Sequence, residues 1–240
     1  MTNNKMKVEI WSDVTCPFCY IGKRKFEHAL NQFKDADKVE IIWKSFELAP
    51  GFQTEPVKDM YQFLAAHNGV SLEQIKTISN QLADSAWQVG LQYNLEKAIP
   101  ANSFNAHRLS HLAKQRQLQD KAEERLFKAY FTEGKNIDDI PTLIALGKEI
   151  GLDAAEVKNV LESDQYADEV RQDIADANQA GVKSVPHFTF NGQESISGAQ
   201  DSKVFLEKLE LAFTAWKSKK SLADITATDG QACKIGEVCS

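Results

Sequence analysis

Two cysteines separated by two residues, in the segment Cys16-Pro17-Phe18-Cys19, lie where an apolar strand meets an amphipathic helix. Residues 7–12 and 39–46 are short and rich in β-branched and aromatic side chains, which is typical of strands. The segment between them carries one apolar stripe at helical spacing, formed by Phe26, Ala29, Leu30 and Phe33. A strand, a helix and a strand in this order predict a β-α-β unit whose two strands are parallel.

Residues 57–180 show helical signals and no convincing strand. Six positions carry signals for the start or end of a helix: Ser71 with Gln74 as a capping box, Asn102, Pro141 and Asp153 as further starts, and Gly151 and Gly181 as ends. Strand character returns with the alternating Phe188 and Phe190 and an Asn191-Gly192 turn, which predicts a hairpin. A final helix is expected to begin at Asp201 or Ser202.

This order of elements predicts an α/β protein in which two separated stretches of chain share one sheet. Residues 1–50 and 182–220 form the sheet with its helices, and residues 51–181 form an inserted helical subdomain. Residues 221–240 are small and polar, and we expect a loosely held tail that carries Cys233 and Cys239.

Charge and hydropathy narrow the classes of partner. A formal net charge of −6 argues against a nucleic-acid-binding protein, which usually carries a basic surface. The first residues lack the pattern of a signal peptide, and no stretch approaches the roughly 18 apolar residues of a membrane span. We therefore expect a cytoplasmic protein without a membrane partner. Its four cysteines are too few for a disulfide scaffold, so pairs of them should be catalytic or metal-binding.

Four segments together resemble the FrnE-type branch of the DsbA family of thioredoxin-fold proteins: SDVTCPFCYIGKRKFEHAL, NSFNAHRLSHLA, AYFTEGKNIDD and SVPHFTFNGQESISGAQ. The resemblance implies a thioredoxin-like fold with an inserted all-helical subdomain. It also implies a thiol–disulfide oxidoreductase, which acts on thiols and disulfides of proteins or small molecules without a bound cofactor. Relatives of this branch include 2-hydroxychromene-2-carboxylate isomerases and kappa-class glutathione transferases.

The expected chemistry of the cysteine pair follows from its place at a helix start. Cys16 occupies the position expected for the N-cap, and Pro17 suits the first helical position. Free helical N–H groups there lower a thiol pKa from about 8.5 to between roughly 3.5 and 7.5. We therefore expect Cys16 to be the attacking thiolate and Cys19 the more buried, resolving thiol. Phe18 stands where periplasmic DsbA proteins have a histidine, which predicts a milder oxidant.

The resemblance also assigns Val185 and Pro186 to substrate binding. In the family this proline is cis and faces the cysteine pair, and the preceding peptide bond exposes backbone groups that pair with an extended substrate. Asp13 and Glu9 are candidate acids for the proton of Cys19. We prefer the interpretation that Asp13 solvates a turn and that Glu9 faces solvent, so neither is assigned to the catalytic set.

His107 and His111 are four residues apart on one predicted helix, a spacing that can chelate zinc. Arg108 stands where a zinc metalloprotease motif requires glutamate, so we expect a packing or cleft-lining role and no metal. The resemblance suggests that Asn102 and His107 border the active-site cleft.

Three alternatives remain at this point. The four cysteines could close one zinc site, although the spacing of Cys233 and Cys239 is longer than usual. The same scaffold could serve a glutathione-dependent isomerase or transferase with glutathione as co-substrate, although such relatives commonly replace the cysteines. A holdase-like binding protein is the third. The oligomeric state is left open.

Half of the cysteines lie in the last eight residues. We expect Cys233 and Cys239 to act as a second redox pair that exchanges electrons with Cys16 and Cys19, because a tethered dithiol has a high effective concentration.

Overall fold

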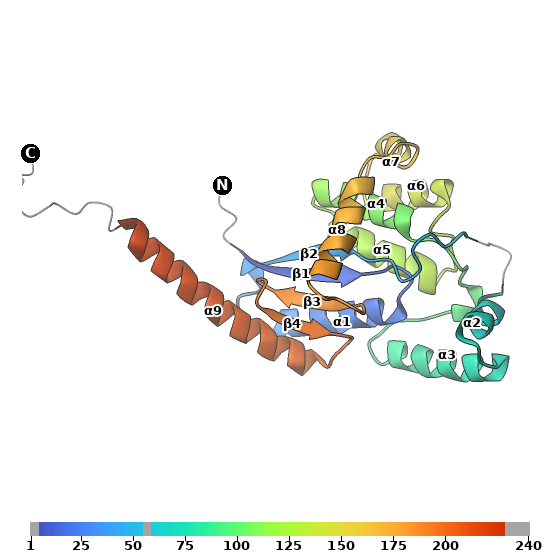
Figure 1. Ribbon diagram of the computed structural model, residues 1–240, viewed down its shortest axis with the longest axis horizontal. Helices are drawn as coiled ribbons and strands as arrows, with labels where there is room; N and C mark the ends of the chain where they lie inside the picture. The colour runs from blue at the N-terminus through green and yellow to red at the C-terminus, as the bar shows by residue number, and fades with distance from the viewer. Residues whose placement is uncertain (1–4, 55–58, 229–240) are drawn as a thin grey trace, which may run out of the picture.

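The computed structural model describes residues 5–54 and 59–228, and side chains as far as Lys219. Its strands form one sheet in the order β2-β1-β3-β4 (Figure 1). They are β1 (Met6–Ser12), β2 (Val39–Ser45), β3 (His187–Phe190) and β4 (Glu194–Ser197). β1 pairs with β2 in parallel and with β3 in antiparallel orientation, and β3 pairs with β4 in antiparallel orientation. The predicted β-α-β unit and the predicted hairpin are therefore confirmed.

Helix α1 (Pro17–Gln32) connects β1 to β2, and α9 (Ser202–Thr228) follows β4. The helices between β2 and β3 are α2 (Met60–Asn68), α3 (Leu72–Trp87), α4 (Phe104–Gln115), α5 (Gln119–Phe131), α6 (Ile140–Glu149), α7 (Ala154–Leu161) and α8 (Ala167–Gln179). Two short 3₁₀ helices, η1 (Ala36–Lys38) and η2 (Leu95–Lys97), complete the elements of the described residues. This arrangement confirms an α/β fold with a helical insertion.

The capping signals mark most helix starts correctly. Ser71 and Gln74 form the predicted capping box of α3, and the side chain of Asp153 accepts from the backbone N–H of Glu156 at the start of α7. Ser103 is the backbone N-cap of α4 but makes no side-chain capping hydrogen bond, and the predicted residue Asn102 supplies one. Asn102 lies one residue earlier, where its Oδ1 accepts from the backbone N–H of Phe104 at 2.8 Å.

The predicted tail begins too early. Helix α9 continues past Lys220 to Thr228, and its far end projects beyond the sheet (Figure 1). Leucine and alanine at positions 222 and 223 are good helix formers, and they outweigh the polar residues on which the prediction relied. Cys233 and Cys239 lie outside the described residues, so their expected redox role stays a prediction.

Aromatic packing fixes α1 against both the sheet and α9, and α9 also contacts the sheet through Phe205 and Phe188. The ring of Phe26 lies 5.5 Å from that of Phe188 on β3 and 5.7 Å from that of Phe205 on α9, measured between centroids. Phe33, which follows the last residue of α1, meets Phe213 of α9 edge to face at 5.2 Å. Burial of these rings makes α1 a rigid support for the residues at its N-terminus.

The side chain of Gln119 hydrogen-bonds to the backbone of β2 at one edge of the sheet. Strand β2 is an edge strand, so its backbone groups would lack a partner strand on one side. Gln119 on α5 accepts from the N–H of Trp43 at 3.2 Å and donates to the carbonyl of Trp43 at 3.0 Å. The side-chain amide of Gln119 thus takes the place of a neighbouring strand's peptide group and attaches the helical insertion to the sheet.

Among the residues described, no helix combines the length and the apolar character that crossing a bilayer requires.

Candidate active site

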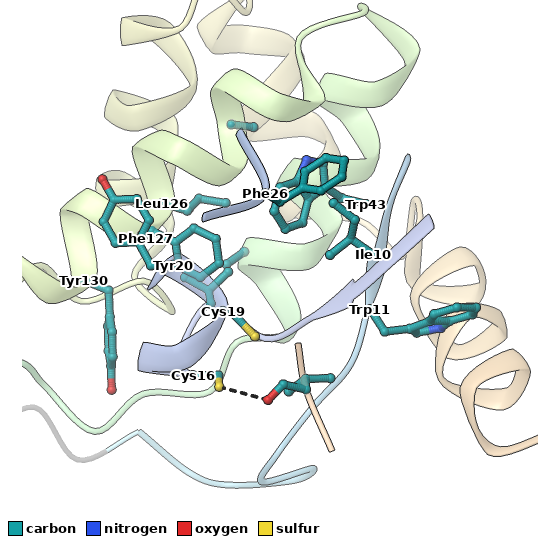
Figure 2. Packing of buried hydrophobic residues seen from close by; sticks show 14 of the residues in the cluster. Ile10, Trp11, Cys16, Cys19, Tyr20, Phe26, Trp43, Leu126, Phe127 and Tyr130 are labelled. Carbon is teal, nitrogen blue, oxygen red and sulfur yellow. Dashed lines mark hydrogen bonds between the residues drawn. The ribbon is translucent and has the colours of Figure 1, made fainter. Parts of the chain in front are cut away.

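The end of β1 and the start of α1 place the two cysteine thiols next to each other (Figure 2). Cys16 is the N-cap of α1 and has extended backbone, and Pro17 occupies the first turn. The backbone N–H of Cys19 donates to the carbonyl of Cys16 at 3.0 Å. Cys16 keeps 4% of its surface exposed, whereas Cys19 has none. Both thiols are free, and their placement agrees with the sequence prediction.

The two thiols differ in acidity. The pKa of Cys16 is lowered, first because the Cys19 thiol hydrogen-bonds to its sulfur, and also because backbone N–H groups of Cys19 and Phe18 point at it; burial and the charge of Asp13 oppose this. The pKa of Cys19 is raised well above the usual value, chiefly by complete burial and then by the neighbouring Cys16 sulfur. When the pair loses its first proton, the negative charge therefore resides on Cys16.

The loop before β3 lies against Cys16. The Val185–Pro186 peptide bond is cis, and the Cys16 thiol donates to the carbonyl oxygen of Val185 with 3.5 Å between sulfur and oxygen (Figure 2). The backbone N–H of Gly198 donates to the carbonyl of Pro186 at 2.8 Å and fixes the loop to the end of β4. Gly22 on α1 faces the proline ring, since a β-carbon there would lie 3.0 Å from Cγ of Pro186. Close packing thus sets the distance between the loop and α1.

Asp13 stabilises a turn, as expected, but it does so from the interior of the protein. It is 1% exposed, and its carboxylate accepts from the backbone N–H of Thr15 at 2.9 Å and of Leu48 at 2.7 Å. Its negative charge raises the pKa of Cys16. Sequence reasoning set this residue aside, although an aspartate two residues before a threonine is a signal for a side-chain turn of this kind. Glu9, by contrast, is half-buried on β1, where it accepts from Thr189 at 3.5 Å.

His107 and His111 pack inside the protein rather than bordering a cleft. His107 is 2% exposed, and its Nε2 lies 3.0 Å from the carbonyl oxygen of Phe46 and 3.9 Å from Oδ1 of Asp13. Burial lowers the pKa of His107, which favours the neutral ring. Nε2 of His111 lies 3.1 Å from Oδ2 of Asp173. Within the part of the chain that is described, no three histidine, cysteine or carboxylate side chains are grouped for a metal ion.

Asn102 is also a structural residue. Its Nδ2 donates to the carbonyl oxygen of Phe52 at 3.1 Å, which ties the start of α4 to the loop after β2.

Comparison with known proteins agrees with this geometry. Residues 7–210 match the model of the DSBA-like thioredoxin domain. The uncharacterized protein YwbO of Bacillus subtilis is 34% identical over 202 residues, which cover 82% of this chain and 92% of that protein.

Many solved structures share the fold. A probable DsbA oxidoreductase from Streptomyces coelicolor is similar with a TM-score of 0.81 and 35% identity, covering 98% of this chain and 96% of that one. The cytosolic disulfide reductase DsbM from Pseudomonas aeruginosa is similar with a TM-score of 0.55 and 16% identity, covering 90% of this chain and 99% of that one. At that identity the second likeness concerns the fold alone.

Proposed function

This chain belongs to the DSBA-like thioredoxin domain family, and we propose that it acts as a thiol–disulfide oxidoreductase through Cys16 and Cys19. The observation that carries the proposal is the asymmetry of the two thiols. Cys16 is slightly exposed and has a lowered pKa, while Cys19 is completely buried beside it and has a raised pKa. A nucleophile needs some exposure and a lowered pKa. A resolving thiol that must not react with outside partners needs burial and a raised pKa.

In the reducing direction, the exchange takes two steps. The Cys16 thiolate attacks one sulfur of the substrate disulfide, a Cys16–substrate disulfide forms, and the other substrate sulfur leaves and takes up a proton. Cys19 loses its proton and attacks the Cys16 sulfur, which closes the Cys16–Cys19 disulfide and releases the second substrate thiol. The substrate gains two electrons and two protons; the protein supplies both electrons, the proton of Cys19 and the proton that Cys16 released to solvent when it ionised. A thiol reductant such as glutathione or a dithiol protein restores the pair.

The Val185–Pro186 loop supports the binding half of this proposal. While Cys16 is a thiol, it donates to the carbonyl oxygen of Val185. In the mixed disulfide Cys16 has no hydrogen to donate, so that carbonyl can accept from a backbone N–H of the substrate. Val185 and Pro186 would then hold an extended peptide in the manner of an added strand.

Retention of both cysteines favours this function over a glutathione-dependent isomerase or transferase, which requires only one activating group beside the glutathione sulfur. The substrates we propose are protein and small-molecule disulfides. A total of four cysteines, too few for a disulfide scaffold, supports the proposed cytoplasmic location.

The order of thiol reactivity tests the proposal. In a variant whose Cys233 and Cys239 are both serine, iodoacetamide should label Cys16 well before Cys19, because only Cys16 has a lowered pKa. Since the thiolate is the reactive form, the labelling rate of Cys16 should fall only when the pH drops below its lowered pKa. Mass spectrometry of the digested protein measures both rates between about pH 4 and pH 9. Equal rates at the two cysteines would contradict the assigned roles.

A further inference from the structure

Tyr93 reaches the cysteine loop, residues 13–18 at the junction of β1 and α1, from the helical insertion. It lies between α3 and η2, it is 8% exposed, and its hydroxyl donates to the carbonyl oxygen of Pro17 at 2.7 Å. We propose that Tyr93 is a positioning residue for the Cys16 thiolate and acts through the peptide group between Pro17 and Phe18. This inference rests on the proposed exchange at Cys16 and assigns to it a residue from outside the cysteine loop.

The peptide group between Pro17 and Phe18 connects the Tyr93 hydroxyl to the reactive sulfur. Its carbonyl oxygen accepts from Tyr93, and its N–H, which belongs to Phe18, points at the sulfur of Cys16. A hydrogen bond to the carbonyl of a peptide group polarises that group, so its N–H becomes a better donor. The gain is largest when the acceptor is an anion, because charge-assisted hydrogen bonds are the stronger ones. The Tyr93 hydroxyl therefore stabilises the Cys16 thiolate more than the neutral thiol.

The backbone on both sides of Tyr93 is fixed to the end of α5. The N–H of Asn94 donates to the carbonyl oxygen of Phe131 at 2.7 Å, and Nδ2 of Asn94 donates to that of Thr132 at 2.7 Å. On the other side, the hydroxyl of Thr132 donates to the carbonyl oxygen of Gln92 at 2.6 Å. These hydrogen bonds hold the segment in place and keep Tyr93 at the cysteine loop.

Aromatic packing also orients the ring of Tyr93. Its centroid lies 4.7 Å from that of Phe131 and 6.2 Å from that of Tyr20, and both pairs are stacked. Tyr20 follows Cys19 on α1, so the ring packs against the helix that carries the thiols. Burial raises the pKa of Tyr93, and so does the charge of the Cys16 sulfur. The hydroxyl therefore keeps its proton, and it remains a donor when Cys16 ionises.

Tyr93→Phe removes only the hydroxyl and tests the inference. The pKa of Cys16 is measured from the pH dependence of iodoacetamide labelling, in the Cys233→Ser/Cys239→Ser background. We expect this pKa to rise by about 0.5, which lowers the thiolate fraction about threefold at pH values below it. At pH values above it, glutathione buffers should show a Cys16–Cys19 disulfide that is about threefold more stable, because the reduced form has lost stabilisation; this corresponds to roughly 15 mV.

Tyr130→Phe is the matched control. Tyr130 on α5 is a second buried tyrosine near Cys16, 4% exposed, and in the described part of the chain no hydrogen bond joins its hydroxyl to the cysteine loop (Figure 2). This variant should keep the wild-type pKa of Cys16. Both variants retain Cys19 and Asp13, whose effects on that pKa therefore stay the same. Circular dichroism and urea denaturation compare the folds.

Fluorotyrosine at position 93 should shift the pKa of Cys16 in the opposite direction. Its phenol is more acidic than that of tyrosine and is a stronger donor of nearly the same shape. The pKa of Cys16 should therefore fall below the wild-type value, which a residue needed only for packing would not produce.

A wild-type pKa of Cys16 in the Tyr93→Phe protein would overturn the inference. An equal rise in the Tyr130→Phe protein would do the same, as would a rise with fluorotyrosine. Wild-type protein whose Cys16 is labelled no faster than Cys19 would instead refute the assignment of Cys16 on which this inference rests.

Discussion

Cys16→Ser protein is expected to lose thiol–disulfide exchange by at least about a thousandfold, because serine has no sulfur with which to form the mixed disulfide. The fold should survive, since serine is a preferred N-cap residue and is nearly isosteric with cysteine. Reduction of insulin with dithiothreitol as recycling reductant measures the loss, and circular dichroism checks the fold.

Cys19→Ser protein should fail differently. Without a resolving thiol, the disulfide between Cys16 and the substrate persists, so non-reducing electrophoresis should show a stable adduct. Both variants are best made in a Cys233→Ser/Cys239→Ser background, which removes the tail thiols as alternative nucleophiles. Exchange by the Cys16→Ser variant at more than about a tenth of the wild-type rate would contradict the assignment of Cys16.

Gly22→Val is expected to impair exchange through the Val185–Pro186 loop. A β-carbon at Gly22 would lie 3.0 Å from Cγ of Pro186 and 3.6 Å from atoms of Ala199 and Phe188. The branched side chain must push the loop away from Cys16, so we expect exchange with a protein disulfide to fall about tenfold or more. A small disulfide such as hydroxyethyl disulfide, which does not need backbone pairing, should be affected less. Overpacking should also cost about 1–3 kcal/mol of the free energy of unfolding.

Gly147→Val is the matched control for this experiment. Gly147 is also a helical glycine, on α6, and a β-carbon there would lie 2.8 Å from Cγ2 of Val157 on α7 and 3.4 Å from Cδ1 of Leu109 on α4. It should lower the free energy of unfolding by a similar amount, measured by urea denaturation, without altering the ratio between the protein and the small disulfide. If both variants change that ratio equally, the loop has no specific role in binding substrate.

Local sequence patterns predict many elements of this fold, because the signals for a strand, a helix face or a helix start lie within a few residues of one another. The strand segments, the apolar stripe of α1 and the capping box at Ser71 depend on neighbours within a few residues of the chain. The placement of Cys16 and Cys19 follows from the same local information, since a helix start determines which thiol meets the free N–H groups.

The features that the patterns did not predict depend on distant segments. Burial of Asp13 requires the backbone of Leu48, and burial of His107 requires the carbonyl of Phe46. Phe18 lines a cavity whose other wall is formed by residues of α2 and α3, so this cavity exists only because those helices lie near the cysteine loop. Such contacts join residues far apart in the chain, and no single window of sequence contains them.

Equilibration of the Cys233→Ser/Cys239→Ser protein with glutathione redox buffers tests the central claim most directly. Acid quenching, alkylation and mass spectrometry would give the fraction of protein that holds a Cys16–Cys19 disulfide at each ratio of reduced to oxidised glutathione. We predict one transition with the stoichiometry of a two-electron couple, in which a tenfold change of the equilibrium constant corresponds to about 30 mV. Two thiols that stay reduced in every buffer, or that form only separate glutathione adducts without a disulfide between them, would contradict the account.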